Sequence, residues 1–231
     1  MTDQKSSIEQ WGESGLYRAP MAVIDFETTG FKADECRIIQ VAIVHSNLGM
    51  KNQELVYKGY INPCCDIPKE STKVHHITND MVCESGTFAD CKDEILSHLD
   101  NRLLGAYNLP FDYGFLNAEL GRCGEGLFPW FGICGMILAR YVDTEMQGKG
   151  YHKLENVAGR RGIKFNPHDA GEDAMATSLL LDSLMGEASQ RWGKRFNTIR
   201  EYWSFQREVA IQQERKLRER FRRTVWPWTD W

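Results

Sequence analysis

The sequence predicts an α/β domain in which helices pack against a mixed β-sheet, followed by a basic helical extension. Apolar, β-branched segments of strand length come first, within residues 21–61, and helical patterns with one further strand follow them. The 231 residues, of which 42% are hydrophobic and 26% charged, are enough to bury one substantial core. We therefore expect a main domain at residues 21–189, a loosely attached lead-in at residues 1–20 and an extension at residues 190–231.

Four strands are predicted in the main domain. Residues 21–25, 37–44 and 54–61 have strand-like composition, and the short polar connections between them favour a three-stranded meander. A fourth strand is expected at residues 103–107, where a short apolar segment is typical of a buried strand. Residues 127–135 contain both glycine and proline, so this segment is expected to be a loop.

Helical patterns occupy most of the remaining main domain. Thr87-x-x-Asp90 matches a capping box in which Asp replaces Glu, and it predicts a helix that ends near Leu99. Pro110 stands where another helix would begin, with Phe111 and Phe115 on its apolar face. Further helices are expected at residues 69–74, 136–142, 153–161 and 171–185.

Two carboxylates, Asp25 and Glu27, lie two positions apart at the end of the first predicted strand. Side chains alternate along a strand, so both point to one face, where they repel each other unless a cation lies between them. Mg²⁺ or Mn²⁺ is the expected cation because these hard ions take carboxylate oxygens as ligands. Taken alone, the pair fits a strand end with two solvated acids better, so its meaning depends on acids elsewhere.

Further acids follow at the beginnings of two predicted helices. Asp112 lies after the strand at residues 103–107, at the kind of junction where catalytic carboxylates often lie, although it is also a common first-turn residue. His168 and Asp173 flank the start of a later helix, so His168 could accept a proton while Asp173 binds a metal ion. This last cluster, considered separately, also fits an ordinary acidic helix N-terminus.

Together, the three clusters resemble the exonuclease motifs of the DEDDh family, the DnaQ-like 3′–5′ exonucleases. The shared order is D-x-E, then N-x-x-x-D beginning at Asn108, then H-x-x-x-x-D. Val74-His75-His76-Ile77-Thr78 is also similar to the V-H-x-I-T segment of the DNA polymerase III epsilon subunit group, and residues 138–140 and 152–162 are similar to that group as well.

The resemblance covers about residues 21–185 and implies a ribonuclease H-like fold, a mixed five-stranded sheet flanked by helices. Tyr107 departs from the family pattern, since many relatives have histidine before the asparagine. We expect this departure to be tolerated because position 107 lies outside the implied metal ligands.

The resemblance also implies a role for each site residue. Asp25, Glu27 and Asp173 would hold one divalent ion, and Asp25 would reach a second ion supported by Asp112. His168 would deprotonate the attacking water. The expected substrate-binding residues are those that would hold the terminal nucleotide, border its base or sugar, or otherwise contact it: Thr28, Thr29, Phe31, His76 and Asn108.

The extension differs from the main domain in charge. Residues 1–189 contain 17 Lys and Arg against 27 Asp and Glu, a net −10, whereas residues 190–231 contain 11 against 5, a net +6. The absence of Gly and Pro from residues 194–226 predicts a long helix with Leu217 and Phe221 on one side. This helix could follow a nucleic-acid backbone, bind a polymerase-type partner through its tryptophan-rich end, or pack on the main domain.

Several classes of protein are excluded by the sequence. No apolar segment approaches the roughly 20 residues that span a membrane, and the polar beginning is not a signal peptide, so we expect a cytoplasmic protein. Seven cysteines without C-x-x-C spacing argue against a disulfide framework or a structural zinc site, and reduced, mostly buried thiols are expected.

The sequence therefore predicts a 3′–5′ exonuclease of DNA replication or repair that uses two divalent ions, Mg²⁺ or Mn²⁺. Its expected partner is a nucleic acid 3′ end, with single-stranded DNA favoured. Two alternatives stay open: an exoribonuclease of the same family, and a proofreading or scaffolding subunit that acts mainly through residues 190–231.

Overall fold

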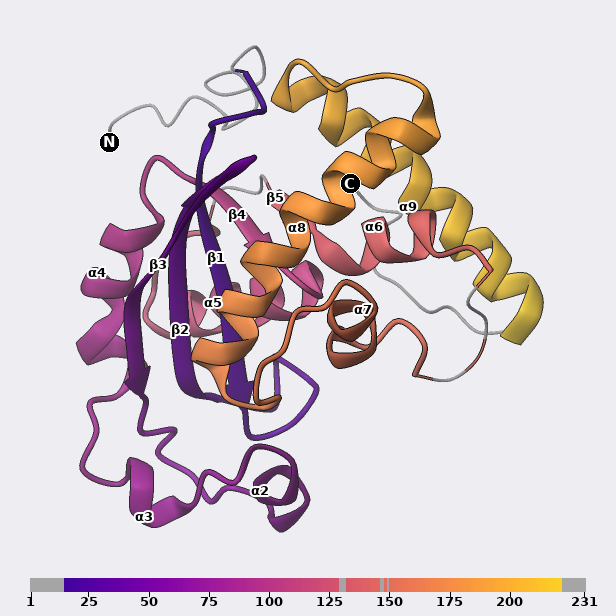
Figure 1. The fold of residues 1–231 in the computed structure, drawn as a ribbon. Coiled ribbons are helices and arrows are strands. Elements are labelled where there is room, and N and C mark those ends of the chain that lie inside the picture. Colours follow the sequence, from indigo (N-terminus) through magenta and orange to yellow (C-terminus); the bar gives the residue numbers. More distant parts are fainter. Residues whose placement is uncertain (1–14, 129–131, 146–147, 149, 222–231) are drawn as a thin grey trace.

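The computed structural model of the chain describes residues 15–128, 132–145, 148 and 150–221, with side chains as far as residue 216 (Figure 1). Within this part of the chain a five-stranded sheet has the order β3-β2-β1-β4-β5. Its strands are β1 (Pro20–Thr28), β2 (Ile38–Asn47), β3 (Met50–Tyr60), β4 (Leu103–Ala106) and β5 (Gly132–Cys134). The first three strands form an antiparallel meander, and β4 and β5 run parallel to β1. The predicted mixed sheet is confirmed.

Helices cover both faces of this sheet (Figure 1). The long helix α8 (Ala170–Trp192) crosses β1, β2 and β3 on one face, while α4 (Phe88–Leu99) and α5 (Leu109–Arg122) pack on the other. The remaining described helices are α2 (Lys69–His75), α3 (Asn79–Val82), α6 (Gly135–Val142), α7 (Leu154–Arg160) and α9 (Ile199–Phe221). In the described part of the chain, no helix combines the length and the apolar character needed to cross a membrane.

The sequence explains why these elements form. β2 begins with seven consecutive buried residues, as expected for a strand covered on both faces. The predicted capping box is present, because Thr87 receives the N3 backbone N–H and Asp90 receives the Thr87 backbone N–H. A second, smaller apolar cluster, formed by Ile39, Ile67, Ile77 and Val82, holds α2 and α3 near the carboxyl end of β1.

Several predicted boundaries differ from the structure, most clearly at the first, third and fifth strands. The first strand continues to Thr28 because pairing with β2 extends past Asp25, so both acids lie inside the strand. The third strand begins earlier, at Met50, for the same reason. The loop prediction for residues 127–135 is wrong at Gly132–Cys134, where parallel pairing with β4 forms β5; residues 129–131 lie outside the described part.

The C-terminal segment packs on the main domain through its first turns. α8 continues to Trp192, past the predicted boundary at residue 190, and ends at Gly193 in a left-handed conformation. In α9, the side chains of Tyr202, Phe205 and Val209 are buried in the main core. The packing alternative therefore holds for this part of the extension, whereas the side chains of Leu217 and Phe221 and the tryptophan-rich end lie outside the described residues.

Gln206 attaches α9 to the edge of the sheet. Its Oε1 accepts the Cys134 backbone N–H at 2.8 Å, and its Nε2 donates to the Gly132 carbonyl at 3.0 Å. The Tyr202 hydroxyl donates to the same Oε1 at 2.7 Å. The side-chain amide of Gln206 therefore provides hydrogen-bond partners for the Cys134 N–H and the Gly132 carbonyl, on the side of β5 that faces away from β4.

The seven cysteines are all free thiols. Cys134 alone is buried, and Cys64, Cys65 and Cys83 are exposed. The prediction of mostly buried thiols is therefore wrong, since most of these cysteines lie on helix surfaces and in loops rather than in strands.

Candidate active site

The site is built around the carboxyl end of β1. Asp25 pairs with Ala42 and Glu27 pairs with Gln40 in the antiparallel register, so both acids point to the face of the sheet that α8 covers. Phe26, between them, is buried on the opposite side, as the alternation of a strand requires. The strand therefore presents two carboxylates to one space, and its pairing with β2 shifts register only after Glu27.

Asp112 joins them from the first turn of α5 and is only 4% exposed. Pairing between β1 and β4 spans Met21 to Val23, so the later N–H of Phe26 is available, and it donates to Asp112 Oδ1 at 3.1 Å. Burial raises the pKa of Asp112 well above its usual range, although this hydrogen bond opposes the shift.

The beginning of α8 supplies the remaining groups. Asp173 is 9% exposed, and its Oδ2 accepts the backbone N–H of His168 at 3.2 Å. His168 has φ of +68°, a left-handed conformation that turns the chain sharply into the helix and leaves the imidazole exposed. The other carboxylate oxygen of Asp173, Oδ1, is buried and has no hydrogen-bond partner among the described atoms.

These elements bring the predicted groups together. One ligand atom each from Glu27, His168 and Asp173 lie within 4.8 Å of one another. Burial, followed by repulsion from Asp173, raises the pKa of Glu27 to about 8. Burial also raises the pKa of Asp173 to about 7, although the hydrogen bond from the His168 N–H opposes this shift. The pKa of Asp25 is also raised well above its usual range by burial and by the charges of Asp112 and Asp173.

We call Asp25, Glu27, Asp112 and Asp173 the acid cluster. Four carboxylates with raised pKa values and one buried, unpaired oxygen fit the oxygen-rich ligand set that a hard divalent cation takes. The predicted metal ligands therefore occupy one connected space in the fold.

The loop after β1 is held by its own hydrogen bonds. The Thr28 hydroxyl donates to the Gly30 carbonyl at 2.6 Å, and the Thr29 hydroxyl accepts the Arg37 N–H at 2.9 Å. Ser71 of α2 donates to the Thr29 carbonyl at 2.9 Å. The Thr28 hydroxyl can still accept a hydrogen bond from another group, and the Thr29 hydroxyl can still donate one.

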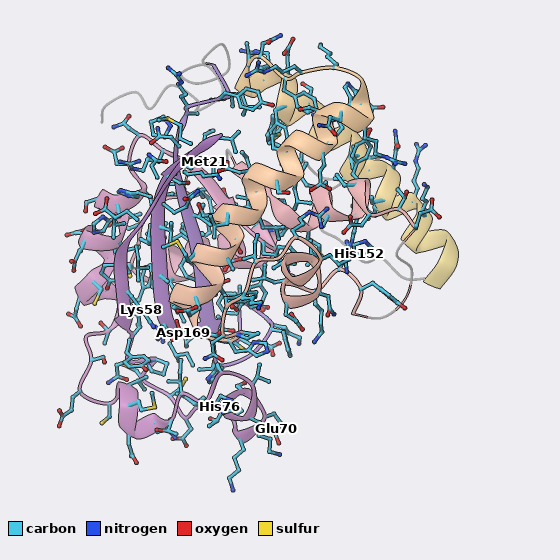
Figure 2. All side chains as sticks on the ribbon, viewed as in Figure 1. Met21, Lys58, Glu70, His76, His152 and Asp169 are labelled. Atoms are coloured by element: carbon cyan, nitrogen blue, oxygen red, sulfur yellow. The ribbon has the colours of Figure 1, made fainter. Side chains whose placement is uncertain are left out.

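Among the other predicted substrate-binding residues, Phe31 is 90% exposed and His76 is also exposed, whereas Asn108 has a buried, unpaired Oδ1. Figure 2 shows His76 beside α2, below the end of the sheet where Lys58 and Asp169 lie, and far from Met21 at the other end.

Sequence reasoning missed His75, the neighbour of His76. His75 is buried, its Nδ1 accepts the Ile77 N–H at 3.0 Å, and its Nε2 has no hydrogen-bond partner among the described atoms. Burial lowers the pKa of His75, as do His76 and His168, while a hydrogen bond with the Thr28 backbone opposes the shift. Because Nδ1 accepts the Ile77 N–H, the neutral ring carries its proton on Nε2. The sequence marked this position as the histidine of the V-H-x-I-T segment, and the fold shows that it is buried.

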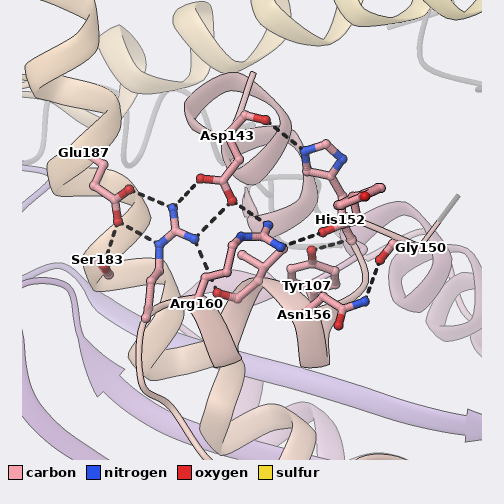
Figure 3. A network of polar contacts seen from close by, with 11 residues as sticks. Tyr107, Asp143, Gly150, His152, Asn156, Arg160, Ser183 and Glu187 are labelled. Carbon is pink, nitrogen blue, oxygen red and sulfur yellow. Dashed lines mark hydrogen bonds and ion pairs between the residues drawn. The ribbon is translucent and has the colours of Figure 1, made fainter. Parts of the chain in front are cut away.

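A second polar network, which we call the arginine network, lies away from the acid cluster, between α6, α7 and α8 (Figure 3). Arg161 contacts Asp143 at 2.9 Å and Glu187 at 2.7 Å, and Arg160 contacts Asp143 at 2.7 Å. Nearby, the Tyr107 hydroxyl donates to the His152 carbonyl at 2.5 Å. Tyr107, which departs from the family pattern, therefore forms a structural hydrogen bond through its hydroxyl group.

Comparisons with known proteins agree with this chemistry. The family model described as Exonuclease (RNase_T) matches residues 22–181. The chain is 29% identical over 187 residues to the DNA polymerase III subunit epsilon of Treponema pallidum, covering 80% of this chain and 86% of that protein. It is 31% identical over 172 residues to the 3′-5′ exonuclease DinG of Bacillus subtilis, covering 73% of this chain and 18% of DinG.

Among solved structures, the fold is similar to that of E. coli Exonuclease I in complex with a dT13 oligonucleotide. The TM-score is 0.64 at 16% sequence identity, and the match covers 76% of this chain and 43% of that one. At this level of identity the likeness concerns the fold.

Proposed function

Because the chain belongs to the RNase_T exonuclease family, among the DnaQ-like 3′–5′ exonucleases, we propose that it removes nucleoside monophosphates from DNA 3′ ends. The observation that carries this proposal is the convergence of Glu27, His168 and Asp173 within 4.8 Å at the end of β1. A structural role would not gather acids that repel one another in a buried space.

In the proposed site, Asp25, Glu27 and Asp173 would hold one divalent ion, and Asp25 and Asp112 would hold a second. Two such ions, Mg²⁺ or Mn²⁺, would supply the positive charge that activates water and stabilises the leaving 3′ oxygen in phosphodiester hydrolysis. Asp112 is fixed for this task by the Phe26 N–H, and Asp173 by the His168 N–H. The unpaired Oδ1 of Asp173 supports the assignment.

His168 is the proposed general base. Its exposed imidazole can take the proton of the attacking water, and its position in a loop beside α8 allows the ring to adjust to substrate. The loop with Thr28 and Thr29 holds the terminal nucleotide through the hydrogen-bonding functions that its hydroxyls retain, and Asn108 Oδ1 offers an acceptor. Phe31 borders the base, together with His76 or the more buried His75.

Single-stranded DNA is the proposed substrate, supported by the likeness in fold to Exonuclease I with its bound dT13. The alternative substrate is RNA, since no described residue excludes a 2′-hydroxyl. The test uses 5′-labelled single-stranded DNA, duplex DNA and RNA, each incubated with Mg²⁺, Mn²⁺ or EDTA.

We expect a ladder that shortens from the 3′ end of single-stranded DNA with either ion and not with EDTA. An unshortened label in every condition would contradict the proposed activity, and a faster ladder on RNA would reassign the substrate. The Asp25→Asn variant, purified in parallel, controls for a contaminating nuclease.

A second proposal concerns a polymerase-type partner, because the relative from Treponema pallidum is a polymerase III subunit. The test removes residues 217–231 only, since deletion of the whole extension from residue 190 would remove the buried side chains of Tyr202, Phe205 and Val209 from the core. Co-elution with a replicative polymerase that disappears in the shortened chain would support this partner, whereas no co-elution of the full chain would reject it.

A further inference from the structure

Lys58 projects from β3 toward the beginning of α8. The register places Lys58 opposite Ala42, which in turn pairs with Asp25, so Lys58 and the acids of β1 lie on the same face of the sheet. Its ammonium contacts both oxygens of Asp169, at 2.8 and 2.6 Å, and Figure 2 shows the two residues together at this end of the sheet.

Asp169 connects this ion pair to the helix. It is the N-cap of α8, and its Oδ1 also accepts the Glu172 N–H at 3.1 Å. Burial would raise the pKa of Asp169, but the hydrogen bond from Lys58 and the Glu172 N–H outweigh burial and lower it. The ionised carboxylate of Asp169 therefore binds both the Lys58 ammonium and a backbone N–H in the first turn of α8.

Two further contacts fix the same junction. The buried Gln40 of β2 accepts the Ala170 N–H through Oε1 at 3.2 Å. A Cβ at Gly171 would lie only 3.0 Å from Lys58 Cδ, so the lysine stem crosses closely over the first turn of α8. Residues 169–171 are thus held to β2 and β3 by an ion pair, a hydrogen bond and a close packing contact.

The groups of the proposed reaction lie on both sides of this attachment. His168 immediately precedes Asp169, and Asp173 lies one turn later and accepts the His168 N–H. Within the described part of the chain, neither side chain forms a hydrogen bond or an ion pair with the sheet, so the distance of both residues from Glu27 depends on residues 169–171.

We propose that Lys58 is a positioning residue that, through Asp169, fixes His168 and Asp173 relative to the carboxylates of β1. This role rests on the proposed hydrolysis, and it acts on geometry rather than on contact with the substrate. Because small displacements of reacting groups lower rates steeply, losing the attachment should reduce kcat by about tenfold to hundredfold.

The test compares Lys58→Met, which keeps the stem over Gly171, with Lys58→Arg, which restores a bidentate cation. We expect Lys58→Met to lower kcat as above with KM changed less than about twofold, and Lys58→Arg to recover most of the rate. Asp169→Asn, which retains a capping side chain, should match Lys58→Met, and the double variant should lose no more than either single variant.

A second measurement does not depend on activity. Amide hydrogen exchange of the peptide covering residues 166–174 should be roughly threefold to tenfold faster in Lys58→Met than in the unchanged chain. The matched control is Lys92→Met, which removes a lysine paired with Glu125 on the far face of the sheet and should alter neither measurement.

Three results would overturn the proposal. Unchanged exchange at residues 166–174 would show that Lys58 does not hold the junction, even if the chain proved to have no nuclease activity. A raised KM at constant kcat would assign Lys58 to substrate binding. Equal losses in Lys92→Met would indicate a general effect of losing an ion pair.

Discussion

The acid cluster and the arginine network hold their carboxylates in opposite electrostatic surroundings. Burial acts on both Asp143 and Asp173 in the direction of a higher pKa. At Asp143 the hydrogen bonds from Arg161 and Arg160 outweigh burial and lower the pKa, whereas at Asp173 the pKa rises to about 7. The two pKa values shift in opposite directions because the chain places arginines beside Asp143 and none beside Asp173.

This contrast separates a stabilising arrangement from a binding arrangement. In the arginine network, arginines of the chain itself neutralise the carboxylates and connect three helices. This network therefore stabilises the fold without needing a ligand. Among the described residues, no arginine or lysine forms an ion pair with the four carboxylates of the acid cluster. Such a site lowers stability until a ligand compensates it, which is typical of functional sites.

The largest expected effect comes from Asp25→Asn, which keeps the shape and removes one charge of the acid cluster. We expect kcat/KM to fall by roughly 10³-fold or more, equivalent to about 4 kcal/mol of transition-state stabilisation. In EDTA at pH 8 the same variant should unfold at a higher temperature, because one repelling charge is gone. Asp93→Asn, at an exposed acid of α4, should change neither quantity.

His168→Gln should slow the chemical step by about 10² to 10⁴-fold while divalent-ion affinity, measured by titration calorimetry, stays within a few-fold. The acidic limb of the pH–rate profile should also change. The matched control, His98→Gln, alters a histidine that contacts His45 and Tyr57 on the other side of the sheet. An unaltered pH–rate profile in His168→Gln would remove His168 from the role of base.

Arg161→Met tests the other side of the comparison. It leaves Glu187 without its arginine and Asp143 with Arg160 alone, so the free energy of unfolding should fall by about 2 kcal/mol. The specific activity of the folded fraction should remain unchanged, which urea denaturation and active-site titration can establish together. Lys194→Met, at an exposed ion pair with Glu201, should have a much smaller effect on stability.

The smallest expected effect is a dependence of stability on pH and metal. The folded-state pKa values of Glu27 and Asp173, about 8 and 7, exceed the ordinary values of 4.5 and 3.8 for these side chains. The folded chain therefore retains protons that the unfolded chain releases, and stability falls as pH rises from about 5 to 8. In EDTA the unfolding midpoint should drop across this window, and Mn²⁺ should reverse the drop at pH 8. A midpoint that rises with pH in EDTA would contradict the sign.

Local patterns predicted much of the fold. The meander, the helix capped by Thr87 and the helix beginning near Pro110 follow from strand composition and capping residues, which act over a few positions. β5 could not be predicted in the same way, because three residues form a strand there only through pairing with β4 and with Gln206, 72 residues away from Cys134.

The site residues likewise divide into those that local sequence patterns predicted and those that only contacts between distant elements revealed. The spacing of the acids identified Asp25, Glu27 and Asp173 as candidates, and the fold gathers them with His168. Lys58 and Gln40 carried no motif that distinguished them from ordinary surface or core residues, and His75 lay within the V-H-x-I-T segment without being selected as a site residue. The contacts that bring Lys58 and Gln40 to the beginning of α8 join elements that are distant in sequence.

The hydrogen bonds of the Gln206 amide affect how this chain can associate with other chains. An edge strand with free backbone groups invites pairing with another molecule, and here a side chain occupies those groups on β5. A chain cut at residue 190 would lose α9 and expose both the bare edge and the apolar surface under Tyr202. Self-association, rather than simple loss of the extension, is the outcome to expect from that truncation.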